Sequence, residues 1–117
     1  ANVRAVPGDI FLCSGDFPDG CFDAVISNPP YIRESEIHTL QKEVQFEPET
    51  ALNGGEDGLV FYRCIAVHWT KKLKQGGTLT LEIGEEQAQD VSSMLKNCGM
   101  KNLPKIGIRH FHLEMED

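Results

Sequence analysis

Four consecutive residues, Asn28-Pro29-Pro30-Tyr31, combine hydrogen-bond acceptors, a rigid backbone and an aromatic ring. Proline fixes its own φ angle and has no backbone N–H, so this turn offers acceptors: the carbonyls of Asn28 and Pro29 and the side-chain oxygen of Asn28. A primary amide or aromatic amine presents two N–H donors on a planar group, and two fixed acceptors could hold it while the Tyr31 ring packs against its face. The motif therefore indicates a pocket that orients a planar nitrogen toward an electrophile, by positioning and electrostatic preorganisation.

The same four residues would also suit a rigid turn that only ends a strand. Their context favours the pocket, because the turn directly follows the apolar run Ala24-Val25-Ile26 and precedes a long polar segment, residues 31–57. Long loops in compact domains are commonly lids or binding loops. Within this segment, residues 34–42 are predicted to form a short helix.

Hydrophobic periodicity predicts the elements that position the turn. Asp57 is the expected N-cap of the first long helix, and Gly76-Gly77 are expected to end it. The predicted strands are residues 3–6, 22–27, 78–83, 104–108 and 109–115, and the predicted helices are residues 58–74 and 85–97. Strand 22–27 is expected to be buried on both faces, and strand 109–115 to be antiparallel with one wet face. This order predicts an α/β sheet, in which ligands bind at the carboxyl ends of strands, where the turn lies.

The residues from Phe22 to Ile32, FDAVISNPPYI, resemble the signature of class I amino-methyltransferases, and more specifically that of HemK-type release factor glutamine methyltransferases. The resemblance extends to about Gly99, and Gly8-Asp9-Ile10-Phe11 resembles the family's strand-end motif beside the cofactor adenine. The NPPY motif alone is shared with adenine methyltransferases, whereas its combination with the later segments is more specific. These segments are Glu43-Val44, Phe46-Glu47-Pro48, Ala51-Leu52, Gly54-Gly55, Asp57-Gly58-Leu59, Phe61-Tyr62-Arg63, Gly76-Gly77, Leu81-Glu82-Ile83-Gly84 and Gln87.

The resemblance implies a fold, a methyl donor and a substrate. The fold would be the C-terminal portion of a Rossmann-like class I methyltransferase sheet, mostly parallel with an antiparallel last strand and with helices on its faces. The donor would be S-adenosyl-L-methionine, and the substrate the glutamine of the Gly-Gly-Gln loop in peptide chain release factors, in translation termination. The implied catalytic residues are Asn28, Pro29 and Tyr31, the implied substrate-binding residues are these with Pro30, and the implied cofactor-binding residues are Asp9, Ile10 and Asn28.

Two departures from the family pattern shape the domain prediction. The family's glycine-rich cofactor loop and its N-terminal helical domain would lie upstream of residue 1, so residues 1–117 are expected to be a single partial methyltransferase domain. Two sheet strands would then be missing between residues 3–6 and 22–27, and we expect self-association through the exposed strand edge. The tail, residues 106–117, also differs from the family's Asp-x-x-Gly-x-x-Arg ending.

Composition narrows the possible functions. A net charge of -7 argues against a broad grip on nucleic acid, which depends on Lys and Arg. Two alternatives remain open: an adenine-directed nucleic acid amino-methyltransferase, and a catalytically inactive fragment that acts as a binding module. The four cysteines form no CxxC pair, and His110 and His112 are more typical of a solvated edge strand, so no metal is expected. Because the sequence shows no signal peptide and no long apolar run, we expect a cytoplasmic protein without membrane contact.

Overall fold

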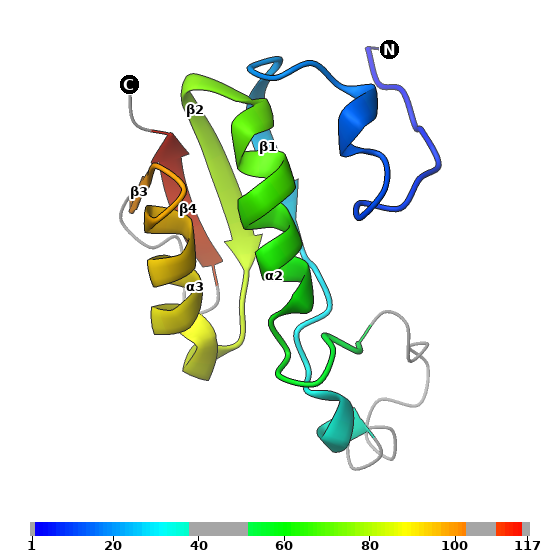
Figure 1. Cartoon of the computed structure of the whole chain (residues 1–117), viewed down its shortest axis with the longest axis vertical. Coiled ribbons are helices and arrows are strands. Elements are labelled where there is room, and N and C mark those ends of the chain that lie inside the picture. Colours follow the sequence, from blue (N-terminus) through cyan, green and yellow to red (C-terminus); the bar gives the residue numbers. More distant parts are fainter. Residues whose placement is uncertain (1, 38–51, 103–109, 116–117) are drawn as a thin grey trace.

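The computed structural model describes residues 2–37, 52–102 and 110–115 of the chain, and its centre is a four-stranded mixed sheet (Figure 1). The strands are β1 (Phe22–Ser27), β2 (Leu73–Glu82), β3 (Met100–Asn102) and β4 (His110–Met115), in the spatial order β1-β2-β4-β3. β1 runs parallel to β2, whereas β4 is antiparallel to both of its neighbours. The antiparallel last strand predicted from the sequence is thus confirmed.

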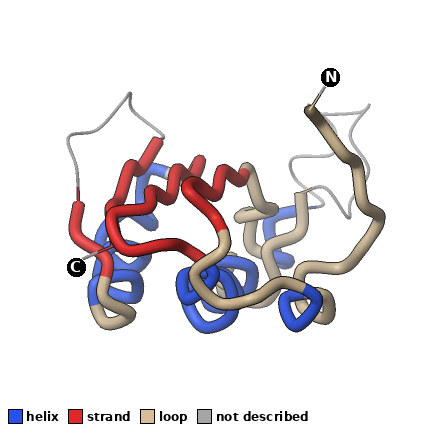
Figure 2. Tube along the Cα trace, turned by 90° about the horizontal axis from the view of Figure 1, so that it is seen from above, coloured by secondary structure: helices blue, strands red, loops and turns tan. Residues whose placement is uncertain are grey.

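The two main helical segments connect the strands and lie on one face of the sheet (Figure 2). The first begins as α2 (Val60–Cys64) and continues through a π-helical stretch, η4 (Ile65–Trp69), and a 3₁₀ turn, η5 (Thr70–Lys72). The second begins as a 3₁₀ turn, η6 (Glu85–Gln87), and continues as α3 (Ala88–Lys96). Two further 3₁₀ turns, η1 (Ser14–Asp16) and η2 (Glu34–Glu36), lie in the connecting segments. The parallel pair β1 and β2, joined by a helix that crosses one face, is the unit that α/β proteins repeat.

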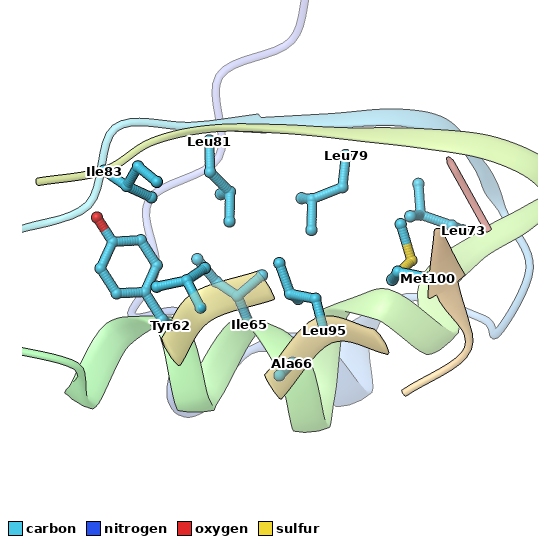
Figure 3. Close-up of a cluster of buried hydrophobic side chains, with 10 residues drawn as sticks. Tyr62, Ile65, Ala66, Leu73, Leu79, Leu81, Ile83, Leu95 and Met100 are labelled. Carbon is cyan, nitrogen blue, oxygen red and sulfur yellow. The ribbon is translucent and has the colours of Figure 1, made fainter. Parts of the chain in front are cut away.

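The hydrophobic core fills the space between β2 and the two helical segments (Figure 3). Alternate residues of β2 point toward the helices, as the period of two in a strand requires, and among them Leu79 and Leu81 are at most 1% exposed. The helices contribute residues spaced three and four apart, including Tyr62 and Ile65. The remaining buried members are Ala66, Leu73, Ile83, Val91, Leu95 and Met100.

The opposite face of β1 is open, which corrects the prediction that this strand is buried on both faces. Val25 packs against the core, but Ala24 is exposed and Ile26 is 79% exposed. Within the described residues no element covers this face, and β1 pairs only with β2, so it is an edge strand. The apolar run correctly predicted a strand, but it carries no information on how many layers pack against it.

Other element predictions also need correction. Residues 3–6 form no strand, and Val3 is 88% exposed, because no strand pairs with this segment. The first helical segment ends at Lys72, and Gly76-Gly77 lie inside β2 instead of ending the helix. Gly76 has a φ of 77°, and the β1–β2 register shifts between Phe22 and Ala24, so the glycines form an irregularity within the strand.

Two further predictions concern the polar segment and the tail. The helix expected over residues 34–42 is seen as the turn η2, and the remainder beyond residue 37 lies outside the described residues. The strand expected over residues 104–108 also lies outside them, whereas β3 was not predicted. The described part of the chain has no helix long and apolar enough to span a bilayer.

Candidate active site

The Asn28–Tyr31 turn follows the carboxyl end of β1, and its residues line a cavity of 390 Å³. Pro29 is buried, Pro30 and Tyr31 are half-buried, and Asn28 is exposed. Ile32, Leu52 and Glu82 complete the lining. The cavity is therefore walled by the predicted turn on one side and by the end of β2 on another.

The N-terminal side of the same turn lines a second cavity, of 610 Å³. Asp9 and Ile10 lie here together with Asn28, so the structure brings together the three residues that the resemblance implied for cofactor binding. The other lining residues are Gly8, Phe11, Ser27, Pro29, Pro30 and Phe61. Asn28, Pro29 and Pro30 line both cavities, so this short backbone segment is a wall that the two spaces share.

The loop that carries Asp9 and Ile10 is held by its own turn and by the first helical segment. The carboxylate of Asp9 accepts a hydrogen bond from the Phe11 N–H at 2.9 Å, as in an Asx-turn. The indole Nε1 of Trp69 donates to the Ile10 carbonyl at 2.9 Å, and the Cys64 thiol lies 3.5 Å from the same oxygen. Burial, with a smaller contribution from the Asp9 carboxylate, raises the pKa of the Cys64 thiol, which favours its neutral form.

The π-helical stretch η4 explains how Trp69 reaches this loop. A π-helical turn has more residues per turn than an α-helix and changes the direction of the side chains that follow. Trp69 is the last residue of η4, and its side chain bonds a carbonyl 59 residues earlier in the sequence. In the sequence, Trp69 continues the spacing of Tyr62, Ile65 and Ala66, an apolar helix stripe that is typical of core residues. It is half-buried against the core, but its indole nitrogen also positions the Asp9–Ile10 loop.

The other side of the turn is held by residues 52–58. Ile32 donates its N–H to the Leu52 carbonyl at 3.1 Å, and Gly54 donates to the Ile32 carbonyl at 2.8 Å, as a short parallel bridge. Gly54 is buried directly against the turn: a Cβ at this position would lie 2.7 Å from the Cα of Tyr31 and 2.9 Å from the Pro30 carbonyl oxygen. The Gly-Gly segment noted in the sequence therefore has a packing role beside the motif.

The end of β2 is fixed by a buried tyrosine. The Tyr62 hydroxyl donates to the Glu82 carbonyl at 2.7 Å, and Tyr62 is fully buried. Burial raises the pKa of Tyr62 far above its usual value, so the hydroxyl stays protonated and remains a donor. Because Glu82 lines the first cavity, this bond fixes one of its walls.

A surface ion pair lies beside the segment that supports the turn. Asp57 accepts hydrogen bonds from both terminal nitrogens of Arg63, at 2.8 and 3.0 Å, and from the Leu59 N–H at 2.9 Å. The Arg63 guanidinium, helped by the Leu59 N–H, lowers the pKa of Asp57 from 3.8 to about 2. The prediction that Asp57 is the N-cap is wrong, because α2 begins at Val60 with Leu59 in the cap position and no side-chain cap hydrogen bond. The Asp57 carboxylate instead binds the Leu59 N–H, two residues after it.

Residues of the site that were not predicted from sequence as functional include Leu52, Phe61, Trp69 and Gln87. Leu52, Phe61 and Trp69 resemble ordinary core residues in the sequence. Hydrophobic periodicity indicates that a residue is buried, but it does not indicate which cavity lies beside it. The described residues contain no group of three or more His, Cys, Asp or Glu side chains that could hold a metal ion.

The fold is that of the class I methyltransferases. A protein from Thermus thermophilus described as a putative DNA modification methylase, solved with S-adenosyl-L-methionine, superposes with a TM-score of 0.61 at 16% identity, over 93% of this chain and 51% of that one. A protein-(glutamine-N5) methyltransferase (release factor-specific) from Alicyclobacillus acidocaldarius superposes with a TM-score of 0.51 at 22% identity, over 92% of this chain and 56% of that one.

Sequence comparison gives the family. A release factor glutamine methyltransferase from Clostridium acetobutylicum is 52% identical over 83 residues, which are 70% of this chain and 29% of that protein. The chain is thus a relative of the release factor glutamine methyltransferases. It spans about a third of the length of the curated relatives that it matches, 29% and 34% in two cases. No protein-family model matches the chain.

Proposed function

We propose that this chain is part of an S-adenosyl-L-methionine-dependent methyltransferase that methylates the side-chain amide nitrogen of a glutamine in peptide chain release factors. The glutamine would be that of the Gly-Gly-Gln loop. The proposal takes its substrate from the relatives, which are 52% and 44% identical and carry that name, and takes its site from the geometry of the Asn28–Tyr31 turn.

The observation that carries the proposal is the wall shared by the two cavities. A methyl transfer needs the accepting nitrogen and the methyl carbon to meet in line, about 3 Å apart. Asn28, Pro29 and Pro30 border the 390 Å³ cavity on one side and the 610 Å³ cavity on the other. A glutamine amide in the first cavity and a donor beside Asp9 and Ile10 in the second would meet at Asn28.

The acceptors of the turn would perform the main chemical task. As the nitrogen attacks, its electron pair forms the new N–CH₃ bond, the bond from the methyl carbon to sulfur breaks, and the sulfur keeps that pair. Positive charge grows on the nitrogen and its N–H groups. The Asn28 side-chain oxygen and the Pro29 carbonyl oxygen would stabilise this charge, and the two prolines restrict the backbone that carries them before the reaction. The surplus proton can leave after the transfer, so no general base is required.

The test compares the full-length protein that contains this chain with its Asn28→Ala variant. Loss of one preorganised acceptor should lower kcat by about 10²-fold. Transfer of labelled methyl groups to a purified release factor measures this change, and Asn97→Ala, at an exposed residue after α3, is the matched control. Unchanged turnover in Asn28→Ala would show that the turn is not the site.

The choice of substrate needs its own control. A release factor in which the loop glutamine is replaced should accept no label, and double-stranded DNA should accept none either. Label on DNA would favour the adenine-directed alternative, against which the charge of -7 argues. Label transferred by the full-length protein but not by the isolated chain would favour the inactive fragment.

We also propose that residues 1–117 are a partial domain, because the relatives are about three times longer. Calorimetric titration with S-adenosylhomocysteine should then show at least about tenfold weaker binding to the isolated chain than to the full-length protein, the loss expected for about 1.4 kcal/mol of missing contacts. Equal micromolar binding would mean that the cavity beside Asp9 and Asn28 suffices for the donor.

A further inference from the structure

Gln87 lies in the interior of the molecule and joins three segments around the proposed site. It is 7% exposed and ends η6, the turn before α3. Its side-chain Nε2 donates to the Tyr31 carbonyl at 3.0 Å and to the Gly58 carbonyl at 3.2 Å. Its Oε1 accepts from the Gly84 N–H at 3.2 Å. The amide therefore uses both of its hydrogens and its oxygen.

Two glycines approach the Gln87 amide closely. A Cβ at Gly58 would lie 2.7 Å from Nε2 of Gln87, and one at Gly84 would lie 2.9 Å from its Oε1. The Gly84 Cβ position is also 3.2 Å from the Cδ2 atom of the Tyr31 ring, so the ring lies over this glycine. Gln87 and Tyr31 line the same cavity of 330 Å³.

The chemistry of the contacts requires a neutral amide. A carboxylate at this position would turn an oxygen toward two carbonyl oxygens, and an apolar side chain would leave both carbonyls and the Gly84 N–H without this partner. The bond to Gly84 resembles the ordinary cap at the start of a helix. The two bonds from Nε2 serve no helix: they reach residues 56 and 29 positions earlier in the chain.

We propose that Gln87 is a positioning residue for the methyl-transfer reaction. By binding the Tyr31 carbonyl, it fixes the backbone just after Pro30, and with it the direction of the Asn28 and Pro29 acceptors and of the Tyr31 ring. By binding Gly58 at the same time, it holds the supporting segment, residues 52–58, against the turn. The inference rests on the proposed function, since it assigns a role within that site.

Three variants of the full-length protein test the role. Gln87→Met keeps the length and removes both donors. Gln87→Glu keeps the shape, retains one donor when protonated and has none when ionised. Gln89→Met is the matched control at an exposed glutamine of α3. We expect Gln87→Met to lower kcat by at least about tenfold, because removing the hydrogen bonds that orient the residues of a site commonly costs that much activity. Binding of S-adenosylhomocysteine should change less than about twofold, because Trp69, not Gln87, holds the Asp9–Ile10 loop.

A pH series separates positioning from a general loss of stability. A protonated carboxyl can donate one hydrogen bond and a carboxylate none. The turnover of Gln87→Glu relative to wild type should therefore rise at least about threefold from about pH 8 to about pH 5.5, whereas the relative turnover of Gln87→Met should stay flat. The titratable and charged groups that line the cavity with Gln87 are Tyr31, Arg33, Glu36 and Glu86. Wild type contains the same four groups, so turnover relative to wild type corrects for their titration.

The possible outcomes are distinct. Wild-type turnover in Gln87→Met, or equal losses in Gln87→Met and Gln89→Met, would overturn the inference, as would a flat pH profile for Gln87→Glu. If the wild-type protein itself transfers no methyl group, the proposed function fails, and amide exchange still decides the role of Gln87. The Ile32 and Gly54 N–H groups, which bond across the turn, should exchange faster in Gln87→Met than in Gln89→Met. Unchanged exchange would refute the positioning role.

Discussion

Replacing Gly54 by alanine is expected to damage the site through packing alone. Gly54 is buried and has no left-handed φ angle, so an added methyl group meets no backbone restriction. The new carbon would, however, lie 2.7 Å from the Tyr31 Cα and 2.9 Å from both the Gly58 and Pro30 carbonyl oxygens. All three neighbours are backbone atoms of the turn and its supporting segment, so none can move aside by rotating a side chain.

The size of the effect follows from these distances. Ordinary contact begins at 3.4 Å, so the Tyr31 backbone must move by 3.4 − 2.7 = 0.7 Å relative to Gly54. Overpacking of this kind costs about 1–3 kcal/mol of folding free energy. The turn that must move carries the proposed acceptors, and a misplacement near 1 Å can lower turnover by about 10²-fold. We therefore expect a moderate loss of stability and a large loss of kcat.

Two measurements on one set of variants test this reasoning. Thermal unfolding reports the stability of Gly54→Ala, and labelled methyl transfer to a release factor by the full-length protein reports its turnover. Gly15→Ala is the matched control, because a Cβ at Gly15 has nothing within 4 Å and its φ is not positive. Wild-type stability and turnover in Gly54→Ala would refute the close approach between residues 52–58 and the turn.

Three further predictions concern other parts of the molecule. Trp69→Phe removes the donor to the Ile10 carbonyl, and loss of about 1 kcal/mol should weaken S-adenosylhomocysteine binding about fivefold in calorimetry, with a smaller effect on turnover at saturating donor. Asp57→Asn should lower the free energy of unfolding at pH 7 by less than about 1 kcal/mol, because the pair with Arg63 is half-exposed. The pKa of Asp57 is lowered from 3.8 to about 2, so the stability that ionised Asp57 contributes is complete above about pH 4 and is lost as the pH falls through 2. The denaturation midpoints of wild type and Asp57→Asn should therefore converge at about pH 2. Ile26 lies on the open face of the edge strand, so Ile26→Lys should reduce self-association of the isolated chain in sedimentation without lowering its melting temperature. A wild-type chain that sediments as a monomer at all concentrations would contradict the expected association.

The sequence by itself determined the local features of this protein. The continuous apolar run Ala24-Val25-Ile26 predicted β1, and the periods of two and 3.6 predicted β2 and both helical segments, because the order of apolar and polar side chains follows the geometry of strand and helix. The NPPY turn was recognisable because two prolines restrict the backbone whatever surrounds them. The family relationship was also visible, since the residues around that turn occur in a fixed order.

The ends of helices and strands were less predictable, because they depend on which strands pair with each other. Gly76-Gly77 signal the end of a helix when considered locally, yet they lie inside β2 because β1 pairs alongside them with a shifted register. The short β-type run of residues 3–6 resembled a strand, but a strand forms only where another strand supplies its hydrogen bonds.

Only the tertiary structure decided which residues meet at the candidate site. The bonds from Trp69 to Ile10 and from Gln87 to Tyr31 join residues 59 and 56 positions apart, and no pattern within one element reports such distances. The same holds for the wall between the two cavities, which exists because the carboxyl end of β1 lies between the Asp9–Ile10 loop and the end of β2. The order of side chains determines how a segment folds locally. The packing of segments determines which of their atoms lie side by side at the candidate site.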